Sequence, residues 1–298
     1  MTDYGNAITF GYFLVPDTAD YAGLVRQAQL VEECGLELIG IQDHPYQRRF
    51  LDTWTVLTAL ATQTTRVWLF PDVANLPLRP PAVLAKAAAS LDRISGGRFE
   101  LGLGAGSFWE AIAAMGGPTR TPGEAVAALE EAIAVIRLLW SDPPSARFTG
   151  RFYRLAGARP GPAPAHPIGI WVGAVGPRML DLTGRLADGW IPSSSYVPSE
   201  RLSDMNQRID EAATRAGRDP ASIRRLYNVM GTITDGPSAG FLDGPVGQWV
   251  DELTALTVER GMDSYIFAPA DQPEIQLRRF ALEVVPRVRE AAARRRGR

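Results

Sequence analysis

The sequence predicts a (β/α)8 barrel, a fold in which eight parallel strands alternate with eight covering helices. Short apolar runs alternate with amphipathic helical patterns about eight times along the chain. The apolar runs carry hydrophobic residues on both faces, as parallel strands covered by helices require. A doubly wound open sheet is the alternative, but it would need fewer units or a second domain. We therefore expect one domain over residues 1–298, with a ligand site at the carboxyl ends of the strands.

The composition narrows the class of protein. With 298 residues, of which 46% are hydrophobic, the chain can bury a large core. The formal net charge of −2 gives no overall attraction to nucleic acid or to an anionic membrane. The single cysteine, Cys34, excludes a disulfide framework, and no signal-like N-terminus or membrane-length apolar run is present. We expect a cytoplasmic protein that binds neither nucleic acid nor membrane.

Turn residues mark the elements of the first half of the chain. Gly35 ends the first helix, Pro80 and Pro81 suit the first turn of the third, and the Gly96-Gly97 pair closes that helix. Strands are expected at 8–14, 38–41, 67–70 and 99–103, and helices at 17–34, 52–62, 82–94 and 123–140.

The second half begins with an interruption. Residues 143–167 are rich in proline and glycine and predict a small hairpin inserted in the loop after the fourth helix. The alternation then resumes. Strands are expected at 168–172, 189–191, 226–233 and 264–267, and helices at 176–187, 198–216, 245–260 and 272–295.

Polar residues follow the second strand. Asp43 and His44 are neighbours on an extended backbone, so one should face the pocket and the other its wall. The chain has only two histidines, and the other, His166, lies in the inserted segment. His44 is therefore the candidate general acid or base, and its alternative role is to bridge loop carbonyls.

Two glycine-containing loops are candidate ligand sites at the same edge of the barrel. Residues 102–107 lead from the fourth strand towards Glu110, and residues 173–178 precede a helix whose N-terminus would suit a phosphate. The alternative is that both are ordinary tight connections. The spacing of His and Cys offers no metal site, and Ser107 is not in a Gly-x-Ser-x-Gly elbow.

Three motifs together resemble the bacterial-luciferase-like superfamily of flavin oxidoreductases over nearly the whole chain. They are Gly-Gly-Arg-Phe-Glu-Leu-Gly-Leu-Gly-Ala-Gly at 96–106, Pro-Ala-Val-Leu-Ala-Lys-Ala-Ala-Ala-Ser-Leu-Asp at 81–92, and Leu-Ala-Asp-Gly-Trp at 186–190. Asp43-His44 is similar to members that use the deazaflavin F420, whereas FMN monooxygenases of the family more often have Glu-His-His there. The resemblance implies F420 as cofactor, with FMN as the alternative.

The resemblance also implies roles for residues of the site. The cofactor ring would lie across the barrel mouth, against a cis peptide bond between Asp72 and Val73, although an Asp is unusual at that position. His44 would orient or protonate the substrate, Asp43 would fix the loop or the ring edge, and Glu110 would be a second proton donor or acceptor. The cofactor would be held by Asp43, Asp72, Val73, Asn75, Gly104, Ala105, Gly106, Ser107, Gly173, Ala174, Val175, Gly176, Pro177 and Arg178.

The expected function is hydride transfer between F420 and a small organic substrate. One alternative is an FMNH2-dependent monooxygenase that uses O2 and is supplied by a separate flavin or F420 reductase. Another is an F420- or flavin-binding protein without catalysis. The family habit of pairing suggests a homodimer, and loops 143–167 and 192–198 are expected to select the substrate.

Overall fold

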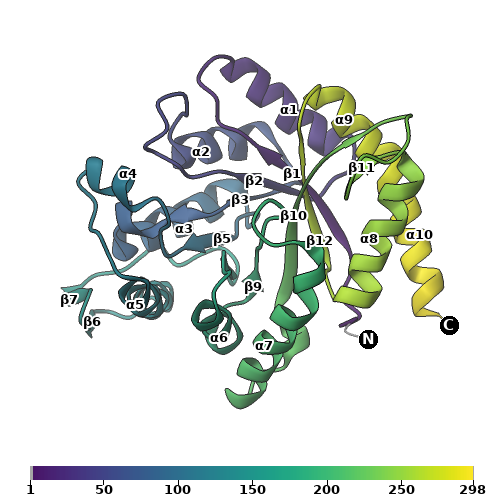
Figure 1. The fold of residues 1–298 in the computed structure, drawn as a ribbon. Coiled ribbons are helices and arrows are strands. Elements are labelled where there is room, and N and C mark those ends of the chain that lie inside the picture. The colour runs from purple at the N-terminus through teal and green to yellow at the C-terminus, as the bar shows by residue number, and fades with distance from the viewer. Residues whose placement is uncertain (1–2, 298) are drawn as a thin grey trace.

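The computed structural model describes residues 3–297 and confirms the barrel: a closed ring of parallel strands surrounded by helices (Figure 1). The strands follow one another in the order β3-β2-β1-β12-β10-β9-β8-β5, and a parallel bridge between Leu69 and Phe99 joins the two ends. The ring consists of β1 (Thr9–Leu14), β2 (Leu38–Ile41), β3 (Trp68–Pro71), β5 (Leu101–Gly104), β8 (Ile170–Val172), β9 (Gly189–Trp190), β10 (Arg224–Ile233) and β12 (Ser264–Pro269). The short strands β4 (Ala74–Asn75) and β11 (Asp243–Gly244) pair with β5 and β10.

Side-chain caps explain where several helices begin. The Asp20 and Asp52 carboxylates accept backbone N–H bonds at the starts of two helices, and Thr121 with Glu124 forms a capping box at a third. The helices are α1 (Tyr21–Glu33), α2 (Thr53–Gln63), α3 (Pro81–Ser95), α4 (Trp109–Ala114), α5 (Pro122–Trp140), α6 (Pro177–Leu186), α7 (Leu202–Arg215), α8 (Val246–Arg260), α9 (Pro273–Arg279) and α10 (Val285–Arg296). Within the described residues, none is long and apolar enough to cross a membrane.

The prediction of a single closing helix over residues 272–295 is wrong in one respect. A π-helical turn at Phe280–Val284 separates α9 from α10. Pro286 follows directly, and it has no N–H to donate to the carbonyl one α-helical turn earlier. The helix therefore changes its hydrogen-bond register before the proline.

The barrel interior is filled by inward-facing apolar side chains below the mouth. Phe70 and Trp171 pack edge to face with ring centroids 5.1 Å apart. They belong to a buried cluster with Leu38, Ile191, Leu226 and Ile266. Because apolar side chains fill the barrel interior, the polar residues of the site lie in the loops at the carboxyl ends of the strands.

The inserted hairpin is present, but it does not reach the barrel mouth. Strands β6 (Ala146–Thr149) and β7 (Arg154–Ala158) pair antiparallel beside α5, outside the ring of strands (Figure 1). The Glu131 carboxylate of α5 accepts backbone N–H bonds from residues 151–153, and His166 binds Asp92 of α3. Because these contacts hold the segment against the outer helices, the expectation that 143–167 lines the pocket is wrong.

Candidate functional site

The strand ends form a pocket of about 140 Å³ at the mouth of the barrel, hereafter the rim pocket. The structure brings together here residues from all four candidate groups, which follow β2, β3, β5 and β8. The lining residues are Asp43, His44, Tyr46, Val73, Ala74, Asn75, Gly104, Ala105, Gly106, Ser107, Phe108 and Gly173.

Asp43 faces the wall, where it fixes the loops around the pocket. Its side chain is 1% exposed, and its two carboxylate oxygens lie 2.7 Å from Nε and Nη2 of Arg79. The Asn75 backbone N–H also donates to it, at 2.9 Å. Arg79 binds Asp52 as well, so one guanidinium joins the loop after β2 to the start of α2.

His44 faces the pocket, and its protonation state follows from its contacts. Its Nδ1 lies 2.6 Å from the amide nitrogen of Gln42, which makes Nδ1 the acceptor and places the proton on Nε2. Burial lowers the pKa of His44, although the negative charge of Asp43 opposes this. His44 is therefore a neutral imidazole with its proton on Nε2, and it lines the rim pocket.

Below the pocket, the peptide bond between Asp72 and Val73 is cis, as the resemblance implied. Val73 lies directly under the glycines: a Cβ at Gly104 would come within 2.8 Å of Val73 Cγ2, and one at Gly173 within 3.2 Å. Side chains at these two positions would displace Val73, so the close approach requires glycine.

The Asp72 carboxyl group points into the barrel above Gly40, and it does not line the rim pocket. Its Oδ2 is buried without a hydrogen-bond partner among residues 3–297. Burial raises the pKa of Asp72 to about 7, and the Asn228 amide opposes the shift. Asp72 is thus a group that changes charge near neutral pH at the base of the site.

A larger hollow of about 430 Å³ extends from residues 105–107, hereafter the glycine loop, to the starts of α5 and α6. Ala105, Gly106 and Ser107 line both this hollow and the rim pocket. Trp109 packs beneath the loop, where a Cβ at Gly106 would lie 2.8 Å from its ring. Phe108, in contrast, is 46% exposed and stands beside His44. The two hollows share the glycine loop as a wall, and we refer to them together as the trough.

The 173–178 loop ends this trough at the N-terminus of α6. Gly176 occupies the cap position, and no side chain caps the helix. The free N–H groups of its first turn and the Arg178 side chain face the larger hollow, an arrangement that suits an anion. A Cβ at Gly176 would meet no atom within 4 Å, so the surroundings of this residue are open.

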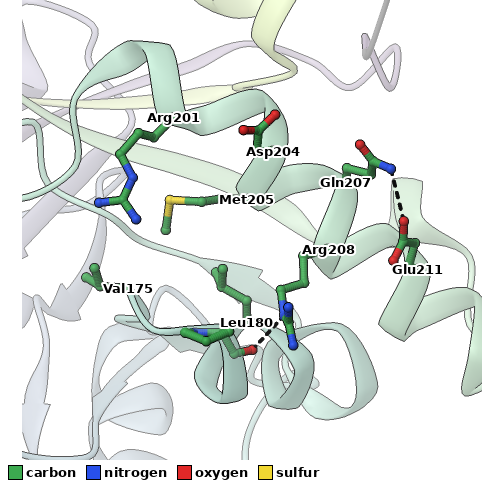
Figure 2. A pocket seen from close by; sticks show the side chains of 9 residues that line it. Val175, Leu180, Arg201, Asp204, Met205, Gln207, Arg208 and Glu211 are labelled. Carbon is green, nitrogen blue, oxygen red and sulfur yellow. Dashed lines mark hydrogen bonds between the residues drawn. The ribbon is translucent and has the colours of Figure 1, made fainter.

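A third hollow, of about 370 Å³, lies on the other side of this loop, between α6 and α7. Figure 2 shows Arg208 of α7 reaching the start of α6, where its Nε donates to the Pro177 carbonyl at 2.9 Å. Its Nη2 binds Asp181 of the same helix at 2.8 Å. Arg208 therefore supports the loop from outside the trough.

Not every predicted site residue is part of the trough. Glu110 is exposed on α4 and lines neither of its two hollows. Ala174 is buried, with its carbonyl bound by the Trp190 indole, while Val175 lines the outer hollow of Figure 2. Within residues 3–297, no group of three or more His, Cys, Asp or Glu side chains is placed to hold a metal.

Sequence reasoning missed four residues of the site. Gln42 and Tyr46 flank His44, and their closeness in sequence was the available signal. Arg79 and Asn228 come from other parts of the chain, and no local pattern indicates their contacts with Asp43 and Asp72.

Sequence comparisons relate the chain to known proteins. A sequence profile described as luciferase-like monooxygenase matches residues 8–239. The 5,10-methylenetetrahydromethanopterin reductase of Archaeoglobus fulgidus is 33% identical over 211 residues, which cover 70% of this chain and 59% of that protein. The F420-dependent glucose-6-phosphate dehydrogenase of Intrasporangium calvum is 31% identical over 226 residues, 72% of this chain and 67% of the relative.

A solved structure shows the same fold. An F420-dependent secondary alcohol dehydrogenase in complex with an F420-acetone adduct has a TM-score of 0.84 against this chain, with 17% identity. The match covers 95% of this chain and 99% of that structure. The chain thus spans nearly all of this structure but only about three fifths of the Archaeoglobus relative's length.

Proposed function

The chain belongs to the luciferase-like monooxygenase family, and we propose that it is an oxidoreductase that transfers a hydride between coenzyme F420 and a small organic substrate. The named relatives include F420-dependent enzymes. The observation that carries the proposal is the neutral His44, which has its proton on Nε2 and lines the rim pocket of the trough.

The residues of the trough fit this cofactor. Asn75 lines the rim pocket, and its buried Oδ1 has no partner within residues 3–297, so it is free to accept a bond from a ring edge. The glycine loop and Gly173 leave room for a flat ring above Val73. The first turn of α6 and Arg178 would hold the phosphate of the cofactor side chain.

When bound, F420 supplies a ring carbon that donates or accepts a hydride. His44 then acts on the substrate: its Nε2–H donates a hydrogen bond to the oxygen that gains negative charge as a carbonyl is reduced. Gln42 holds the imidazole in this tautomer, and Asp43 with Arg79 holds the loop that carries it. A neutral imidazole can donate this hydrogen bond through its Nε2–H.

The test measures oxidation of reduced F420 by acetophenone under anaerobic conditions, followed by cofactor absorbance. His44→Phe keeps an aromatic ring beside Tyr46 but has no N–H, and we expect turnover to fall by about 10²–10³-fold at unchanged F420 affinity. His166→Asn is the matched control, because His166 binds Asp92 outside the trough. Unchanged turnover in His44→Phe would remove His44 from the reaction.

The description of the matching family as a monooxygenase favours a second candidate, an FMNH2-dependent oxygenase. It predicts substrate-dependent O2 consumption with reduced FMN and a separate reductase as partner. A binding protein without catalysis would show cofactor binding and no effect of His44→Phe on any measured property.

Pairing into a homodimer is a further part of this proposal, and light scattering of the purified chain tests it.

A further inference from the structure

Aromatic side chains from separate loops form the wall of the rim pocket on the His44 side. Tyr46 stacks on the His44 ring with centroids 5.3 Å apart, and Phe108 meets it edge to face at the same distance. The Tyr46 and Phe108 rings are themselves 5.8 Å apart. Phe108 is 46% exposed, so an apolar surface remains open to a ligand.

Tyr196, on the loop after β9, lies close enough to Tyr46 to affect its hydroxyl group and is 68% exposed. Burial, the Asp43 charge and the nearby Tyr196 hydroxyl together raise the pKa of Tyr46 to about 12. The Tyr46 hydroxyl is therefore neutral at physiological pH. The wall therefore offers a ligand aromatic surface and uncharged hydroxyl groups.

The rim pocket also has no cation with which to bind an anionic substrate. No Lys or Arg lines it among the described residues. Arg79 is the guanidinium joined to its wall. Asp43 binds its Nε and Nη2, Asp52 also binds Nη2, and the Trp54 ring lies 5.9 Å from its central carbon. Arg178 lies at the far end of the trough, beside α6.

The acidic groups nearest the pocket give no attraction to an anion. Asp43 lines it, and Asp72 lies below it. His44 is neutral and cannot pair with an anion as a full cation would. A phosphate or carboxylate placed beside His44 would lose its hydration without gaining a cation to pair with, which is unfavourable.

Resting on the hydride transfer proposed above, we infer that the second substrate is a neutral, largely apolar ketone, aldehyde or alcohol held against Tyr46, Phe108 and Tyr196. Phosphorylated and carboxylated substrates are excluded from this site. In the reducing direction a C–H bond forms at the carbonyl carbon, the C=O π bond breaks, and the oxygen takes a proton from solvent. Reduced F420 supplies the hydride and its two electrons and is oxidised.

The test compares acetophenone with 4-acetylbenzoate, which differs from it by one carboxylate. With F420 bound to the full chain, we expect kcat/KM for acetophenone to exceed that for 4-acetylbenzoate by about tenfold or more. Phe108→Arg adds a cation to the wall and is expected to reverse this preference. Phe108→Leu, which adds no charge, is the matched control and should keep it. Ligand-observed NMR of both ketones with the F420-loaded protein measures binding without turnover.

The outcomes separate this inference from the proposed function. If F420 binds and 4-acetylbenzoate reacts or binds as well as acetophenone, the substrate class is wrong and hydride transfer stands. If F420 binds but NMR detects neither ketone, the inferred apolar site is also wrong. If F420 itself does not bind, the proposed function fails, and the inference that rests on it fails too.

Discussion

The ion pair between Arg79 and Asp43 holds the loop that carries His44, and Arg79→Met removes it while keeping the apolar stem of the side chain. In the variant, the Asp43 carboxylate, 1% exposed, would keep a single N–H donor from the Asn75 backbone. Removing one partner of a buried ion pair destabilises a protein by about 3–5 kcal/mol. That is a large share of a net stability of about 5–15 kcal/mol.

The assay is urea unfolding followed by tryptophan fluorescence at pH 7. The matched control is Arg49→Met, which breaks the exposed pair of Arg49 with Asp17 and is expected to change the free energy of unfolding by less than about 1 kcal/mol. If Arg79→Met were no more destabilising than Arg49→Met, the pair would not anchor the rim.

Three further predictions concern the phosphate loop and the lower barrel. Gly176→Asp is expected to weaken F420 binding by about tenfold through charge repulsion. The isosteric Gly176→Asn adds no charge and should weaken binding less. Equal binding by both variants would move the phosphate elsewhere. Arg208→Met removes the hydrogen bond to the Pro177 carbonyl and should raise the dissociation constant for F420 several-fold. The control Arg215→Met, on the same helix, should leave this constant unchanged. Fluorescence titration measures both constants. Burial raises the pKa of Glu100 to about 8, opposed by the Gly169 N–H and reinforced by Asp188 and Asp92. The folded chain therefore holds the Glu100 proton more tightly than the unfolded chain does, and stability is lost as the pH rises from about 4.5 to 8. The melting temperature of Glu100→Gln should fall less over this pH range than that of the parent chain. An identical pH profile for the two proteins would refute the shift.

The barrel could be predicted because each strand carries its own signal. Leu38–Ile41 and Leu101–Gly104 are fully buried four-residue strands. Each apolar run is followed by residues that do not continue the hydrogen bonding between strands. The opposite orientations of Asp43 and His44 also followed from local geometry, since adjacent side chains on an extended backbone diverge. Local chemistry thus identified the rim and the two residues at its centre.

The rest depended on contacts between distant parts of the chain. Asp43 and Arg79 are 36 residues apart, and no spacing rule predicts their pairing. The hairpin at 146–158 carries arginines, but its position is set by Glu131 of α5 and by the His166–Asp92 contact. The tautomer and neutral state of His44 depend on burial and on the Gln42 amide, which a sequence pattern does not report.

The most direct test of the account is equilibrium titration of the purified chain with F420 and with FMN, followed by cofactor fluorescence. The FMN arm is repeated with anaerobically reduced cofactor and followed by protein fluorescence. We expect saturable binding of F420, weakened by Gly176→Asp, and no comparable binding of FMN in either state. Preferential binding of reduced FMN would contradict it and make the protein an oxygenase.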